Sequence, residues 1–299
     1  MHKFSFFVLN KTYIIIRWEG RRKSSNMEDR RGMSTTGKVV AGGGSIGIIF
    51  LLIQAFMGGD ASQLIQVLQE QAIQAEAQTA GKELSAEDKR LGDFVATVLA
   101  DTEDVWHKIF RENGSTYREA KLVLFRDAIR SGCGGANSNS GPFYCPADET
   151  VYMDLSFFDV LVNRFGAKRG DFAIAYVIAH EIGHHVQKQT GVLAQINQAR
   201  NSMPQSEFAP LHIAMELQAD FYAGVWAHHV RKYLDEKDFE LALAAAASVG
   251  NDNIHKKTQG YVVEESFTHG SSEQRMYWLS RGFKTGDIRQ GDTFKELLN

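Results

Sequence analysis

Apolar and polar positions follow different periods along the chain, and each period predicts a different kind of element. Apolar residues spaced three and four apart predict amphipathic helices. Short runs of β-branched and aromatic residues predict strands. From about Leu84 onward, the predicted elements are helices at 86–113 and 156–165, strands at 120–127 and 149–155, and an almost continuous helical pattern at 171–234. The order of helix, strands and then helices predicts an α+β fold, mostly helical with a small sheet.

An uncharged apolar run, VVAGGGSIGIIFLLIQAFM at 39–57, precedes this part. Its length is close to the ~20 residues that a helix needs to cross a bilayer. A buried core helix is the alternative, but three consecutive glycines at 42–44 suit a spanning helix better than a soluble one. The run therefore predicts one transmembrane helix before the α+β domain.

The charges on the two sides of this run are unequal. Basic residues are frequent between Arg17 and Lys38, whereas none follows the run before Lys82. The positive-inside rule then predicts a single-pass protein of the bacterial cell membrane, with a cytoplasmic N-terminus and an extracytoplasmic domain. The predicted organisation is a basic cytoplasmic segment at 1–38, a signal anchor at 39–57 in the lipid bilayer, a helical stalk and linker at 58–83, and the domain at 84–299.

Composition narrows the class of protein further. The chain has 299 residues and a formal net charge of -3, which argues against nucleic acid as a partner because nucleic-acid binders are usually basic. Its two cysteines, Cys133 and Cys145, bracket a loop rich in Gly, Asn and Ser. Outside the cytoplasm they can form a disulfide. Two unpaired buried thiols are the alternative.

The candidate chemistry begins at 180–184, where the sequence reads HEIGH, an H-E-x-x-H pattern. On a helix, His180 and His184 lie on one face and can bind one ion, while Glu181 reaches a water on that ion and acts as general base. This is the zincin arrangement for Zn²⁺. The pattern also arises by chance on exposed helices without metal, so a third ligand is needed to decide.

A third ligand is available downstream, in the apolar stretch AMELQADFYAGVW. Glu216 and Asp220 lie four residues apart, on one helical face. Glu216 is the candidate third ligand, and Asp220 is the candidate hydrogen-bond acceptor that supports a ligand histidine. The alternative is a solvated acidic face, which the apolar neighbours disfavour because unpaired buried carboxylates are costly. Two imidazoles and a carboxylate suit zinc among the divalent ions.

A further candidate pair lies near the C-terminus, in FTHGSSEQRMYWLSRGF. His269 precedes a helix that Ser271 or Ser272 can cap, and Arg275 lies on that helix. Hydrolysis of an amide needs a donor to the oxyanion, and His269 is the candidate donor, with Arg275 orienting or assisting it. A loop histidine and a surface arginine are the alternative. The strand at 149–155 is a candidate edge for an extended peptide substrate.

Taken together, these motifs resemble the bacterial putative neutral zinc metallopeptidases, which carry one N-terminal membrane anchor. The resemblance rests on RWEGRRKSSNMEDRRG, GPFYCPADETVYMDLSFF, AYVIAHEIGHHVQ, ELQADFYAGVWAH and FTHGSSEQRMYWLSRGF, in that order. The E-x-x-A-D and T-H-G-S segments are also similar to the CAAX-type and HtpX-like membrane proteases. That similarity implies Glu216 as third zinc ligand and His269 and Arg275 in the active site, although those relatives usually have proline where this chain has Gly270.

The resemblance implies a membrane-anchored zinc metalloendopeptidase of the Glu-zincin type, with one Zn²⁺ and a peptide or protein substrate. Two alternatives remain open: a catalytically silent zinc-binding scaffold at the cell envelope, and a zinc amidase that acts on envelope material. Glu181 argues against the scaffold, because a purely structural site has no need of it and is more often closed by four protein ligands.

Overall fold

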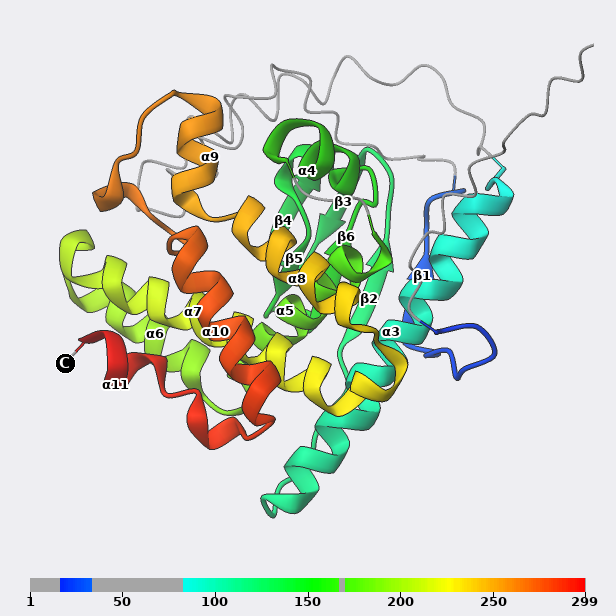
Figure 1. The fold of residues 1–299 in the computed structure, drawn as a ribbon, viewed down its shortest axis with the longest axis horizontal. Coiled ribbons are helices and arrows are strands. Elements are labelled where there is room, and N and C mark those ends of the chain that lie inside the picture. Colours follow the sequence, from blue (N-terminus) through cyan, green and yellow to red (C-terminus); the bar gives the residue numbers. More distant parts are fainter. Residues whose placement is uncertain (1–16, 34–82, 167–169, 299) are drawn as a thin grey trace, which may run out of the picture.

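The computed structural model describes residues 17–33, 83–166 and 170–298 (Figure 1). Its strands are β1 (Met27–Asp29), β2 (Lys121–Leu124), β3 (Ala128–Ser131), β4 (Gly134–Asn137), β5 (Phe143–Cys145) and β6 (Thr150–Met153). Its helices are α3 (Ala86–Glu112), α4 (Phe157–Phe165), α5 (Asp171–Gln189), α6 (Val192–Ser202), α7 (Gln205–Val230), α8 (Glu236–Ser248), α9 (Asn251–Thr258), α10 (Ser272–Thr285) and α11 (Thr293–Leu298). The described chain is therefore mostly helical with a small sheet, in agreement with the α+β part of the prediction.

The sheet that positions the site has the strand order β1-β2-β6-β5. β1, β2 and β6 are parallel, and β5 pairs antiparallel to β6. β3 and β4 form a separate two-stranded hairpin. The strand predicted at 149–155 therefore lies inside the sheet as β6, and the terminal strands are β1 and β5, so the expectation that 149–155 forms the edge is wrong.

The helices are arranged in layers on the sheet (Figure 1). α3 and α5 contact the sheet, α7 packs on α5, and α10 packs on α7. Most residues of α5 and α7 are buried, because both helices are surrounded by other elements. The interior is filled by large side chains, of which Trp106, Tyr176 and Trp226 are almost fully buried.

Glycines allow α7 and α10 to cross at close range. A Cβ at Gly224 would lie 2.2 Å from the Leu279 carbonyl oxygen, and one at Gly282 would lie 2.1 Å from the Phe221 carbonyl oxygen. These distances are well inside van der Waals contact, so only glycine fits at either position. The crossing holds α10 against α7, and through it Arg275 against the carboxylates of α7.

Residues 17–33, the described part of the basic N-terminal segment, belong to the folded body. β1 pairs with β2 through Met27↔Leu122, and Trp18 is buried with its ring 5.7 Å from that of Phe94. Arg31 is also buried, with Nη2 2.6 Å from Asp29 Oδ2. The pairing of β1 with β2 corrects the predicted membrane topology. One membrane crossing between residues 33 and 83 would place β1 and β2 on opposite sides of the bilayer, whereas they are neighbours in one sheet.

The predicted fold is corrected accordingly. No helix in the described part of the chain has the length and apolarity needed to cross a membrane. The run at 39–57 and the stalk and linker at 58–83 lie outside the described residues. The described part of the chain is thus α+β without the transmembrane helix that completed the prediction, and the predicted single-pass location is corrected with it.

Candidate metal centre

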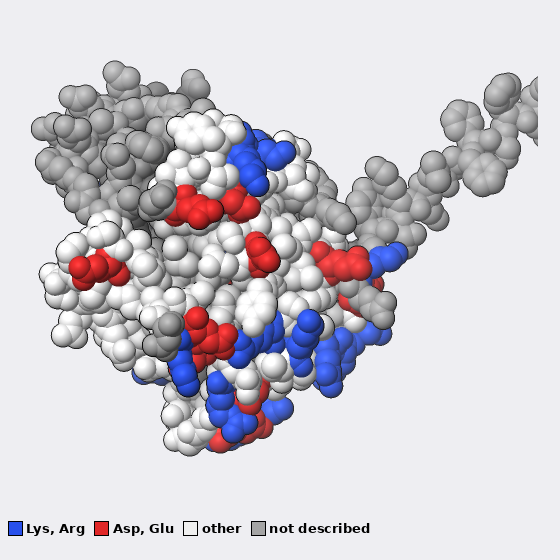
Figure 2. Space-filling model, turned by 60° about the vertical axis from the view of Figure 1, so that its left-hand side comes forward, with Lys and Arg blue, Asp and Glu red and all other residues white. Residues whose placement is uncertain are grey.

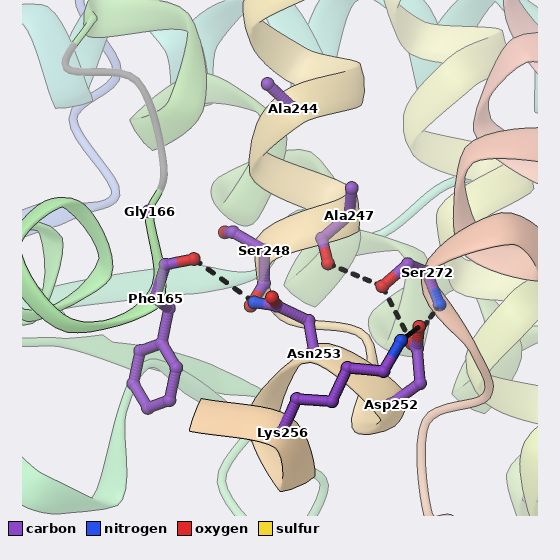
Figure 3. A pocket seen from close by; sticks show the side chains of 9 residues that line it. All are labelled: Phe165, Gly166, Ala244, Ala247, Ser248, Asp252, Asn253, Lys256 and Ser272. Atoms are coloured by element: carbon purple, nitrogen blue, oxygen red, sulfur yellow. Dashed lines mark hydrogen bonds and ion pairs between the residues drawn. The ribbon is translucent and has the colours of Figure 1, made fainter. Parts of the chain in front are cut away.

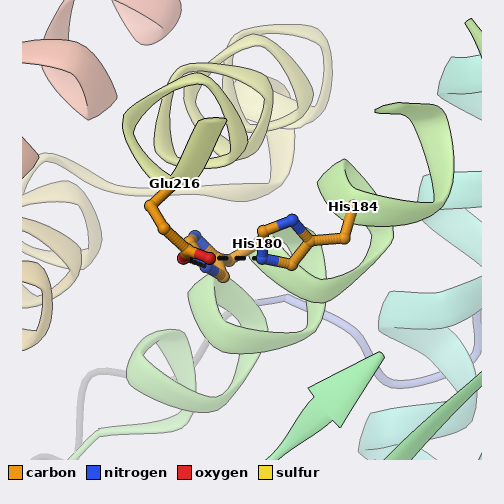
Figure 4. A group of neighbouring side chains, drawn as sticks. All are labelled: His180, His184 and Glu216. Atoms are coloured by element: carbon orange, nitrogen blue, oxygen red, sulfur yellow. Dashed lines mark ion pairs between the residues drawn. The ribbon is translucent and has the colours of Figure 1, made fainter. Parts of the chain in front are cut away.

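Two buried helices bring the candidate ligands together. α5 presents His180 and His184 one turn apart, and α7 presents Glu216 from the facing side (Figure 4). One donor atom from each of these three residues lies within 4.8 Å of the other two. The spacing of four residues places both imidazoles on the same face of α5, and their ring nitrogens face the Glu216 carboxylate.

The surroundings of Glu216 fit a cation. Its Oε2 is buried and has no hydrogen-bond partner among the described residues. It lies 3.4 Å from His180 Nε2 and 3.6 Å from His184 Nε2. Burial acts to raise the pKa of Glu216, but the imidazoles of His269, His184 and His180 outweigh it and hold that pKa well below the ordinary value. A buried, ionised, unpartnered oxygen beside two imidazole nitrogens is a donor set suited to zinc.

Asp220 fixes the orientation of His180. Asp220 Oδ1 lies 2.8 Å from His180 Nδ1, so Nδ1–H donates to the carboxylate and Nε2 is the ring atom directed towards Glu216. Tyr176 donates its hydroxyl to the same oxygen at 2.6 Å. Although Asp220 is fully buried, Arg275 and His180 hold its pKa below the ordinary value. In turn, burial opposes charge on His180, but Asp220 and Glu216 raise its pKa to about 10.

Gln187 orients His184 in the same way as Asp220 orients His180. It was not predicted as a site residue from the sequence. Its Nε2 donates to the Met215 carbonyl at 2.7 Å, which leaves Oε1 to accept from His184 Nδ1–H at 2.8 Å. The Nε2 of His184 is therefore also the ring atom left to bind an ion. The signal available in the sequence was an amide three residues after His184, which places it on the same face of the helix.

Glu181 lies beside the ligand pair and is almost completely buried. Burial raises its pKa, which the imidazoles of His180 and His184 oppose only in part. The backbone N–H of Tyr144, on the terminal strand β5, also interacts with the Glu181 carboxylate. A carboxylate with a raised pKa can hold a proton between two steps of a reaction, as a general base must.

The structure gives different surroundings to His269 and Arg275, the two candidate site residues near the C-terminus. His269 Nε2 lies 3.6 Å from Glu216 Oε2, so this imidazole faces the ligand group. Arg275 is buried and donates Nε to Asp220 Oδ2 at 2.8 Å and Nη2 to Tyr176 at 3.0 Å. Its guanidinium therefore orients Asp220. Gly270, where the similar proteases have proline, has a φ of +83°, which proline cannot adopt.

The two cysteines are joined. A disulfide connects Cys133, beside the β3–β4 hairpin, to Cys145 at the end of β5. The neighbouring Tyr144 hydroxyl lies 2.8 Å from His185 Nδ1, and His185 Nε2 lies 2.7 Å from the Arg118 carbonyl oxygen. His185 thus points away from the ligand group and ties α5 to β5, the strand that touches Glu181.

Surface features offer less definite chemistry. A hollow of about 300 Å³ lies among α4, α8, α9 and the start of α10, and its lining includes none of the ligand residues (Figure 3). On the face drawn in Figure 2, acidic and basic side chains are interspersed with uncharged surface, and the basic ones are more frequent in the lower part of the view.

Comparison with known proteins decides the family. The family model described as putative neutral zinc metallopeptidase matches residues 16–294. The chain belongs to this family. It is 43% identical over 294 residues to the uncharacterized protein YpfJ of Escherichia coli K12, covering 95% of this chain and all of that one. It is 44% identical over 190 residues to the uncharacterized protein Rv2575 of Mycobacterium tuberculosis H37Rv, covering 60% and 63% of the two chains. No solved structure matches this member of the family.

Proposed function

We propose that this member of the zinc metallopeptidase family is a zinc-dependent endopeptidase that hydrolyses peptide bonds in proteins. The observation that carries the proposal is the convergence of His180, His184 and Glu216 in one buried group with Glu181 beside it. The two imidazoles would hold the ion through their Nε2 atoms, since each Nδ1 already has an acceptor. Glu216 would hold it through a carboxylate oxygen.

A zinc ion held there would supply a Lewis acid that makes water a better nucleophile and polarises a carbonyl group. The carboxylate of Glu181 accepts a proton from the attacking water and passes it to the leaving amine nitrogen. Its burial keeps bulk water away from that proton. His269 donates from Nε2 to the developing oxyanion, and Arg275 holds Asp220 in place as the acceptor of His180.

The terminal strand β5 is the proposed docking edge for substrate. It lies beside α5, which carries the ligand histidines. The backbone N–H of its Tyr144 interacts with the Glu181 carboxylate. An extended peptide that runs along this side would bring a backbone carbonyl towards the ligand group. Recognition through the backbone predicts broad tolerance for side chains.

A catalytically silent zinc scaffold is the first alternative. Two features disfavour it: the three ligands leave room for a further ligand, and Glu181 has no role in a closed structural site. A zinc amidase that acts on envelope material is the second alternative. The three ligands and Glu181 suit hydrolysis of a peptide bond and of another amide bond equally well, so an experiment must distinguish the two substrates.

The test is a comparison of substrates on the metal-loaded protein. Zinc content is measured first, and then hydrolysis of unfolded casein and of cell-wall fragments, before and after treatment with a chelator. The proposal predicts about one zinc per chain and casein cleavage that the chelator abolishes and zinc restores. Cleavage of cell-wall fragments alone would favour the amidase, and zinc without turnover on either substrate would favour the scaffold.

A further inference from the structure

The turn between α8 and α9 holds the loop that carries His269. Asn251, the first residue of α9, is buried, and its backbone N–H donates to the Gly270 carbonyl at 3.0 Å. Its side-chain oxygen Oδ1 accepts two further hydrogen bonds, from the backbone N–H of Thr268 at 3.1 Å and of His269 at 2.7 Å. Three contacts thus join one buried asparagine to three consecutive loop residues.

These contacts fix which way the Asn251 amide points. The two backbone N–H groups can only donate, so the atom they face is the amide oxygen. The other amide atom is therefore Nδ2, which lies 3.4 Å from Thr268 Oγ1 and donates to it. The Thr268 hydroxyl thus receives a hydrogen bond from Asn251 and keeps its own hydrogen for another acceptor.

That acceptor is the imidazole of His269. Thr268 Oγ1 lies 2.8 Å from His269 Nδ1, so its O–H can donate to Nδ1. A neutral imidazole carries hydrogen on one nitrogen only, and the Glu216 carboxylate oxygen that faces Nε2 favours the hydrogen on that nitrogen, which leaves Nδ1 to accept. Nε2 is the atom 3.6 Å from Glu216 Oε2, at the ligand group. The N–H of His269 therefore points at the ligand group, beside which the proposed reaction would develop negative charge.

The segments that carry these residues are held firmly together. A Cβ at Gly250 would lie 2.4 Å from the backbone nitrogen of Ser272, so the α8–α9 turn touches the start of α10 directly. Asp252 Oδ1 accepts from both the backbone N–H of Ser272, at 2.6 Å, and its hydroxyl, at 2.7 Å (Figure 3). Asn251 is thereby anchored on both sides, between Gly250 and Asp252.

We propose that Asn251 and Thr268 form a hydrogen-bond relay that sets the tautomer and the direction of His269, so that its Nε2–H serves as donor to the substrate oxyanion. The inference rests on the proposed function and gives it two positioning residues, neither of which touches substrate. Because the relay is a chain of hydrogen bonds, it requires the hydroxyl group of Thr268 but does not require the methyl group.

The tautomer itself can be observed without turnover. Long-range ¹H–¹⁵N NMR on the full chain with ¹⁵N-labelled histidine distinguishes protonated from unprotonated ring nitrogens, and His269→Gln assigns the His269 signals. We expect Nε2–H with an unprotonated Nδ1 in the metal-free and zinc-loaded wild type and in Thr268→Ser. In zinc-loaded Thr268→Val, where the ion engages Glu216, we expect the Nδ1–H tautomer to appear. Wild-type His269 protonated at Nδ1 would overturn the relay.

Kinetics give a second, independent readout. Thr268→Val should lower kcat about tenfold with little change in KM, zinc content or melting temperature, as loss of one hydrogen bond allows. Thr268→Ser should retain kcat. In a His269→Gln background the valine substitution should have no further effect, whereas additive losses would show that Thr268 acts elsewhere. If the wild type binds no zinc or cleaves nothing, the proposed function fails, while the NMR result still decides the relay.

Discussion

The residues around the proposed ligands set hydrogen positions before any ion arrives. Asp220 and Gln187 each take the Nδ1–H of one histidine, so Nε2 is the ring atom of each that faces Glu216. Rings oriented in this way lower the cost of ion binding, because they need not turn when Nε2 binds the ion.

Asp220→Asn is expected to weaken zinc binding about 10- to 100-fold, the range found for such supporting carboxylates. The substitution removes the charge that supports His180 and leaves the buried Arg275 without its main partner. Zinc affinity is measured by competition with a chromophoric chelator. Asp104→Asn, at a carboxylate that is 67% exposed, is the matched control. Equal affinities for Asp220→Asn and wild type would contradict the assigned role.

Zinc binding is also expected to release protons at neutral pH. Asp220 and Glu216 raise the pKa of His180 to about 10 despite its burial, and the pKa of His184 is also raised. In the metal-free protein His180 therefore carries an extra proton at pH 7, which the ion must displace. Apparent affinity should fall as the pH is lowered. Calorimetric titration in buffers of different ionisation enthalpy gives the number of protons, and no net release would contradict the assignment.

The sequence predicted part of this site well. The four-residue spacing of His180 and His184, and of Glu216 and Asp220, is local to one helix each and survives in the structure. Asn251 could not be found in the same way. Its partners lie 17 and 18 residues away, and only the packing of α9 against the α10 N-terminus brings them together.

Among the elements, the crossing of α7 and α10 is the contact most sensitive to volume. Gly224→Ala would press a methyl group into the backbone of α10. We expect the free energy of unfolding to fall by about 1–3 kcal/mol, because overpacking usually costs this much. Chemical denaturation measures it. Gly135→Ala, whose added Cβ meets nothing within 4 Å, is the control and should be near neutral. Equal stabilities would show that the two helices can move apart freely.

Element prediction succeeded where the pattern was long. The helix predicted at 86–113 is observed at Ala86–Glu112, because many turns repeat the same apolar stripe. β1, β3, β4 and β5 were not predicted. Each is as short as β2 and β6, which were predicted, but Gly, Ser, Asn or charged residues surround it in the sequence, and β3 and β4 are only partly buried. Their pairing depends on distant parts of the chain.

On the scale of the whole molecule, the N-terminal segment changes the boundary of the folded body. Residues 17–33 supply a strand, the buried Trp18 and the buried Arg31, all in contact with the region from 83 onward. Several of the basic residues that suggested a cytoplasmic segment instead form ion pairs with α3, such as Arg22 with Glu103 at 2.8 Å. A count of basic residues in the sequence cannot distinguish arginines beside a membrane from arginines that form ion pairs in a folded domain.

Arg31→Ala is expected to lower the melting temperature by several degrees, since removal of one member of a buried ion pair costs about 3–5 kcal/mol. Arg31 bonds both Asp29 and the Asp88 carbonyl of α3. Arg30→Ala removes a pair whose side chains are 38% and 54% exposed, and serves as the control. Its effect should be small. Identical melting of all three proteins would mean that the segment contributes nothing to the fold.

The central claim is that Glu181 performs chemistry at a metal centre built by other residues, and one comparison tests it directly. Zinc content and casein hydrolysis are measured side by side for the wild type and Glu181→Gln, in a chain that retains residues 17–33. The account predicts about one zinc in both proteins and a loss of about 10²- to 10⁴-fold in kcat for the variant, as expected when a general base is removed. Equal hydrolysis by the two proteins, or absence of zinc from both, would contradict it.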